Sequence, residues 1–149
     1  MVNLTIVGRA EFQDSLANLT VVVSRGMELA TKEGAEFIKA AIEENMHGSL
    51  PPKSGGSDPA SRTGNLIESL SIKPLAGGVG LGRWQYEISM DTTKAPYAAR
   101  IELGFHGTDS IGRTYNQPAY PYFFKGVETA IGAGAVDDIF FRNLEEAVR

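Results

Sequence analysis

Apolar residues recur at steps of three and four from Glu11 to Asn45, which is the longest regular pattern in the chain. The positions that share it are Phe12, Leu16, Leu19, Val23, Met27, Ala30, Phe37, Ile38, Ala41 and Ile42. This spacing predicts a long amphipathic helix whose stripe packs mainly on its own domain, with a partner surface along part of the stripe as the alternative. Gly26 and Gly34 each weaken a helix interior by about 1 kcal/mol relative to Ala. A kink or break near 24–26 is therefore compatible with the sequence.

Alternation of apolar and polar residues predicts three short strands. It is clearest from Trp84 to Met90, and a partner strand is expected over 70–75, where Pro74 favours a sheet edge or a bulge. These two strands are expected to form a β-hairpin, and a third strand is expected at 2–6. One apolar and one polar face fit an antiparallel sheet that is covered on a single side. Trp84 is expected to be largely buried on the inner face, beside the long helix.

Proline and glycine mark the bounds of the shorter helices. One helix is expected over 63–70, another from Pro96 to a stop at Gly104, and a third from Pro121, with 132–134 separating it from a last helix. The residues expected to face inward on the last three helices are Tyr97, Ala98, Ile101, Leu103, Phe123, Phe124, Val127, Ile131, Ile139, Phe140, Leu144 and Val148.

The order of these elements predicts an α+β fold in a single domain over 1–149, because alternating parallel βαβ units are absent from it. We expect a small antiparallel sheet packed on one face by a long amphipathic helix, with further short helices and extended loops. Residues 46–61 and 105–117 are expected to be flexible arms. The first arm is either a tolerated insertion or a segment that becomes ordered on assembly.

Composition narrows the classes of function. The chain has 149 residues and no cysteine, so disulfides, thiolate zinc sites and cysteine nucleophiles are excluded. Its net charge is −4, with 14 basic and 18 acidic residues, which disfavours a tight grip on nucleic acid. No apolar run approaches the roughly 20 residues that a membrane span needs, and the first residues do not resemble a secretory signal.

The candidate sites for chemistry are weak. The glycine-rich run at 76–82 fits no phosphate-binding motif, so it is expected to be a hairpin loop. His47 and His106 are the only histidines, and neither lies in a pattern of metal ligands, so no metal and no cofactor are expected. Glu68 and Glu102 lie on two short predicted helices and would form an acid–base pair in a small hydrolase. The alternative for Glu102 is a structural residue with satisfied hydrogen bonds.

The stretch 95–127 places a polar arm between two helices, which suits contact with a neighbour better than enclosure of a substrate. Ile111 and Tyr115 are the apolar members of the middle of this arm, and Tyr120 and Tyr122 follow it. Tyrosine is enriched at the centres of protein interfaces. We therefore name Ile111, Tyr115, Tyr120 and Tyr122 as interface candidates.

Three segments resemble a known family. RTGNLIESLSI at 62–72 is similar to a TG-x-L-x-x-S-I segment, KAPYAARIELGFHGT at 94–108 to a Y-A-x-x-x-E-x-G-T segment, and QPAYPYFFKGVETA at 117–130 to a P-A-x-P-F-x-x-x-A segment. In this order, after a long amphipathic helix, they resemble the tail-completion or head–tail joining (neck) proteins of long-tailed bacteriophages.

The resemblance implies a structural virion protein without catalytic activity. Such a protein is expected to form a ring with copies of itself, expected to be hexameric, around the channel through which DNA passes without specific binding. Its neighbours would be a portal-side connector protein and a tail terminator or tail tube protein, with no membrane partner. It would lie in the virion neck or tail, and in the host cytoplasm during assembly. The alternative role within this region is tail terminator or minor tail protein.

Overall fold

The computed structural model describes residues 8–46, 64–75 and 84–149. The elements in chain order are α1 (Arg9–Glu44), α2 (Asn65–Glu68), β1 (Leu70–Pro74), β2 (Tyr86–Met90), α3 (Ala98–Leu103), β3 (Phe105–Thr108), β4 (Thr114–Gln117), α4 (Tyr122–Gly132) and α5 (Ala135–Val148). The α+β class predicted from the sequence is confirmed. The strand expected at 2–6 and the arm at 47–61 lie outside the described residues.

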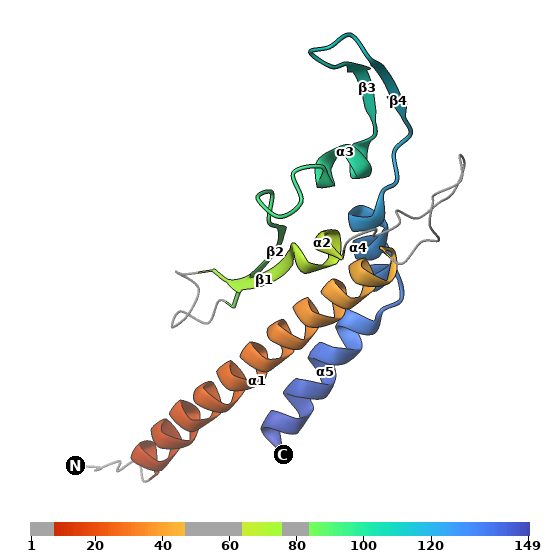
Figure 1. Cartoon of the computed structure of the whole chain (residues 1–149). Helices are drawn as coiled ribbons and strands as arrows, with labels where there is room; N and C mark the ends of the chain where they lie inside the picture. The colour runs from red at the N-terminus through yellow and green to blue at the C-terminus, as the bar shows by residue number, and fades with distance from the viewer. Residues whose placement is uncertain (1–7, 47–63, 76–83) are drawn as a thin grey trace, which may run out of the picture.

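Helices α4 and α5 run back along α1, as Figure 1 shows. The helix does not break at 24–26, where the sequence allowed a kink or break, since α1 is helical without interruption from Arg9 to Glu44. Gly26 instead allows a close approach, because an added Cβ there would lie 2.9 Å from the Cβ of Ala147 on α5. Gly126 plays the same part for α4, where an added Cβ would lie 2.6 Å from the Cα of Ile42.

Polar contacts reinforce the packing of α5 on α1. The Arg142 guanidinium lies 2.6 Å from the Glu33 carboxylate, and the Asn143 amide donates to the same carboxylate at 2.9 Å. These hydrogen bonds, Asn143 first, hold the pKa of Glu33 below its ordinary value. The Asn143 side chain is itself buried and bonded to Glu33, so it fixes the position of α5 along α1.

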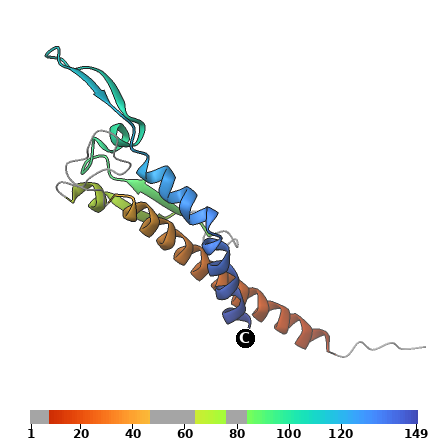
Figure 2. The same ribbon diagram turned by 90° about the vertical axis from the view of Figure 1, so that its right-hand side faces the viewer.

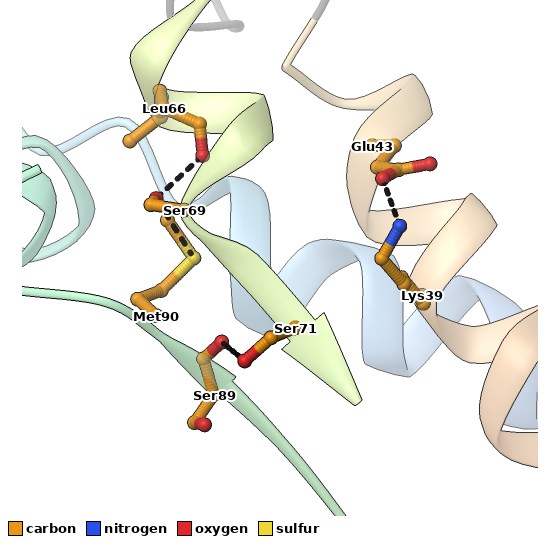
Figure 3. A network of polar contacts seen from close by, with 7 residues as sticks. All are labelled: Lys39, Glu43, Leu66, Ser69, Ser71, Ser89 and Met90. Carbon is orange, nitrogen blue, oxygen red and sulfur yellow. Dashed lines mark hydrogen bonds and ion pairs between the residues drawn. The ribbon is translucent and has the colours of Figure 1, made fainter. Parts of the chain in front are cut away.

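The first sheet is the predicted β1–β2 hairpin. The strands are antiparallel, with Leu70 opposite Met90 and Pro74 opposite Tyr86. Figure 3 shows the Ser69 hydroxyl donating at 2.7 Å to the carbonyl oxygen of Leu66, which joins the end of α2 to the start of β1. The hairpin packs against α1, so the prediction of a small sheet covered by the long helix is confirmed.

The core lies at the C-terminal end of α1, where α1 meets the first sheet, α3 and α4. Its buried members are Ile42, Met46, Leu66, Leu70, Ala95, Ala98 and Tyr122. The N-terminal part of α1 makes no contribution, because every described side chain from Ala10 to Val21 is exposed. The main buried cluster thus lies at one end of an elongated molecule (Figure 2).

The second sheet was not predicted. Residues 105–117, expected to be an arm without regular structure, form the antiparallel β3–β4 hairpin, with Phe105 opposite Gln117 and Thr108 opposite Thr114. The hairpin projects from the end of the molecule opposite the start of α1 (Figures 1 and 2). Four-residue strands of mixed polar character give no clear alternation, which explains why the sequence pattern does not reveal them.

Several residues expected to face inward are exposed. They are Tyr97, Leu103, Phe124, Ile131 and Val148. On α4 the buried residues are Tyr122, Gly126 and Ala130, which are spaced by four, and Phe123 and Val127 are half-buried against the core as expected. Trp84 is only partly buried against α1, and its indole N–H has no hydrogen-bond partner in the described part of the chain.

Candidate functional site

The three segments that carry the family resemblance meet in the core. Leu66 and Leu70 come from the first segment, Ala98 from the second and Tyr122 from the third, and all belong to one buried cluster with Ile42 of α1. Leu70, Ala98 and Tyr122 are each more than twenty residues apart in sequence, so the fold brings the three segments to one junction. This junction carries the β3–β4 hairpin, because β3 follows α3 and β4 precedes α4.

Glu102 fastens the junction. Its carboxylate accepts hydrogen bonds from the backbone N–H of Phe123 at 2.9 Å and of Phe124 at 3.0 Å. These amides lie in the first turn of α4, whose N-cap residue, Pro121, provides no side-chain cap. A carboxylate there satisfies orphan donors and complements the positive end of the helix dipole. Glu102 is therefore a satisfied structural residue, which was the alternative to an acid–base role.

Tyr122 is the second polar group at this junction. Its hydroxyl donates to the carbonyl oxygen of Ala98 at 3.4 Å, a long bond that spans α4 and α3. Burial, followed by the negative charge of Glu102, raises the pKa of the Tyr122 phenol far above its ordinary value. The phenol therefore stays protonated at any ordinary pH and acts as a buried donor.

The two carboxylates of the suggested acid–base pair lie in different settings. Glu68 is exposed on α2, while both carboxylate oxygens of Glu102 are engaged by α4. A hollow of about 250 Å³ lies beside Glu102, and Met90, Ala98 and Phe123 are among the side chains that line it. Such a mainly apolar hollow offers few groups that could orient a polar substrate.

The tip of the hairpin is organised by Asp109. One carboxylate oxygen accepts from the backbone N–H of Ile111 at 3.0 Å and of Arg113 at 2.9 Å. The other accepts from the Arg113 side chain at 2.9 Å and from the Tyr115 hydroxyl at 3.1 Å. Gly112, at a φ of 83°, supplies the left-handed residue that the turn requires. These bonds, led by the Arg113 amide, hold the pKa of Asp109 below its ordinary value.

The four interface candidates fall into two groups. Ile111 is 69% exposed and Tyr115 is 41% exposed, both on the hairpin. Tyr120 and Tyr122 are buried within the chain, so the assignment of these two as interface residues is corrected to packing residues. Tyr115 is partly used inside its own subunit, because its ring lies 6.2 Å from that of Phe105. Ile111 is thus the freest apolar side chain at the hairpin tip.

A larger set of apolar residues is exposed on the helices, and the sequence anticipated only those on α1, through the alternative of a partner surface along part of its stripe. Those on the helices include Phe12, Leu16, Leu19, Val21, Leu29, Phe124, Ile131, Phe141 and Val148. The sequence does indicate this exposure for α1, because its apolar stripe extends further than the helices α4 and α5 that pack along it. Large exposed apolar patches usually mark interaction sites.

The described residues offer little support for a metal site or a membrane-spanning helix. His106 is exposed on β3, and His47 lies outside the described residues. Across 8–46, 64–75 and 84–149, no group of three or more histidine or acidic residues could hold a metal ion. Within the same ranges, no helix has the length and apolarity to cross a bilayer.

Comparisons of the chain with protein-family models, with curated proteins and with solved structures gave no match.

Proposed function

We propose that this chain is a structural virion protein at the head–tail interface of a long-tailed bacteriophage. It assembles as a ring around the DNA channel and joins or completes the tail, between a portal-side connector and a tail terminator or tail tube protein. The observation that carries the proposal is the junction at Glu102. There the three segments that resemble the neck family meet and hold a projecting hairpin.

The attachment of the hairpin suits a docking element. Gly104 leaves α3 at a φ of 76°, and an added Cβ there would lie 2.9 Å from the backbone N of Ala119. The backbone N–H of Tyr120 donates to the carbonyl oxygen of Ile101 at 2.8 Å. Both ends of the hairpin are thereby fixed to the body, while the exposed side chain of Ile111 lies at its far end. A preorganised element loses little entropy when it binds a neighbour.

The charge of the chain supports the same role. The chain has a net charge of −4, so the walls of a channel built from its copies would repel the DNA backbone weakly and let DNA slide through. Specific contacts with phosphates would hinder such movement. On this proposal the protein is not an enzyme, and it lies in the virion neck or tail after assembly in the host cytoplasm.

The test replaces Ile111 by Asp in phage particles. A charge at the hairpin tip would be desolvated in a docking contact, so Ile111→Asp is expected to leave the fold intact by circular dichroism but to block completion of infectious particles. The matched control is Ser110→Asp, which adds the same charge at the neighbouring exposed position. Normal particle yield from Ile111→Asp would contradict the proposal, as would a particle reconstruction without this chain in the neck or tail.

A further inference from the structure

The N-terminal part of α1 extends beyond the helices that pack on it. Helix α5 ends at Val148, and its Ala147 lies against Gly26 of α1. The helical residues before Gly26 therefore continue for about 25 Å, at 1.5 Å per residue, past the end of α5. Figure 2 shows this free segment of α1 clearly.

An apolar seam runs along this free segment. We define the seam as Phe12, Leu16, Leu19 and Val23, which are spaced by four, three and four residues. Phe12 is 67% exposed, Leu16 53% and Leu19 47%. Leu19 and Val23 also border a hollow with Trp84, so the seam is fully open only at its N-terminal half. Alternating steps of three and four are the pattern by which two helices pair in a coiled coil.

The same stripe already binds a helix further along. Continuing the spacing from Val23 leads to Gly26 and Ala30, and Ala30 is fully buried in the part of α1 that α5 covers. Small residues on this part allow α5 to approach closely, whereas the seam carries large residues and has no helix from its own chain among the described elements. The seam is thus built for a helix.

The flanks of the seam are compatible with an identical helix. The positions beside it in the heptad pattern are Gln13, Ser15, Thr20 and Val22, which carry no charge. Charges at these flanking positions normally select the partner and repel a like copy. Because these flanking positions are neutral, two identical seams can pair without repulsion between like charges. The flanks also present no charge that a different helix would need to complement.

We propose that the seam pairs with the seam of a second copy of this chain, α1 against α1, in a two-fold symmetric dimer. The helices run antiparallel, because α5 covers the stripe from Gly26 onward and would separate two parallel copies. In this register Leu16 faces Leu19 of the second copy, and Phe12 faces Val23, which is half-buried and borders the hollow with Trp84. Four side chains bury less than the roughly 800 Å² per partner of a stable complex, so the dimer forms reversibly with concentration.

This inference does not rest on the proposed function, because the dimer would form in the purified protein without any phage partner. A two-fold contact is the commonest symmetry of self-association. The dimer contact would also bury the exposed apolar side chains of the seam in solution. Exposed patches of this kind otherwise promote aggregation.

The chain contains no cysteine, so disulfide trapping can report the contact directly. Phe12→Cys and Val23→Cys are made as separate variants, mixed and oxidised. The antiparallel register predicts a mixed dimer linking 12 to 23, and little dimer from either variant alone, because two copies of residue 12 would be about 16 Å apart along the axis. Homodimers at 12 as abundant as the mixed dimer, or no trapped dimer, would overturn the arrangement.

The mass of the protein in solution, measured by sedimentation, provides a second test of the dimer. Leu16→Glu is expected to halve the mass at high concentration while the helix content by circular dichroism is kept. Val21→Glu is the control, since Val21 is 68% exposed but lies on the opposite side of the helix from Phe12. An unchanged mass for Leu16→Glu, or a wild-type protein that stays monomeric, would refute the dimer. Neither result bears on the particle test at Ile111, so the two proposals fail separately.

Discussion

At the scale of single residues, Glu102 shows how a motif glutamate can be structural. Its carboxylate joins α3 to the first turn of α4 across twenty-one residues of sequence, which is why no local capping pattern announces it. Pro121 occupies the N-cap position and has no side chain that could bond the exposed amides. Glu102 therefore provides, from a position distant in sequence, the hydrogen-bond acceptor that a Ser, Thr or Asp at the N-cap usually provides.

Loss of this carboxylate should weaken the junction. Glu102→Ala would leave two amides of α4 without their acceptor, and we expect it to lower the free energy of unfolding by about 2 kcal/mol. Glu102→Gln keeps an acceptor oxygen but loses the charge, and about half that effect is expected. Urea unfolding followed by circular dichroism measures both. Glu128→Ala, at an exposed position of α4, is the control. A change below about 0.5 kcal/mol for Glu102→Ala would show that the cap is not important.

At the scale of elements, long periodic patterns predicted well and short contacts between distant residues did not. The period of α1, the alternation in β2 and the stop at Gly104 each follow from neighbours in sequence, and the structure confirms them. The β3–β4 hairpin depends instead on Asp109 and on the contact of Phe105 with Tyr115. The inward face of α4 was predicted only in part. Phe123 and Val127 pack against the core as expected, whereas Phe124 and Ile131 are exposed, and hydrophobicity alone does not reveal the close approach of Gly126 to Ile42.

The hairpin should open at low pH through Asp109. Hydrogen bonds to its carboxylate, led by the amide of Arg113, lower its pKa in the folded state. A group with a lowered folded pKa stabilises the fold above its unfolded pKa of about 4, and this contribution is lost as the pH falls through the folded value.

Amide chemical shifts of Ile111 and Arg113, followed by NMR from neutral to acidic pH, test this assignment. They should stay constant down to about pH 4 and change only below it. Asp109→Asn should remove this transition. A transition centred above the ordinary carboxyl range would contradict the assignment to Asp109.

At the scale of the whole molecule, stability is distributed unevenly. The buried cluster lies around Ile42 and Tyr122, at one end of α1, and the residues from Ala10 to Val21 have no buried side chain. The free segment of α1 and the β3–β4 hairpin lie at the two extremities (Figure 1). Both carry exposed apolar residues. On the two proposals above, these exposed residues are the ones that contact other chains.

Hydrogen exchange should follow this gradient along α1. A free helical segment of about four turns is marginally stable in water, since isolated helices of this length gain little beyond their own hydrogen bonds. In the monomeric Leu16→Glu variant, amides of residues 12–23 should therefore exchange roughly a hundredfold faster than those of residues 30–42, which are covered by α5 and α4. In the wild-type protein the same amides should slow as concentration rises, because the second copy covers the seam. Uniform protection along α1 in the monomer would mean that the free segment is stabilised from within its own chain, and the seam would then have no need of a partner.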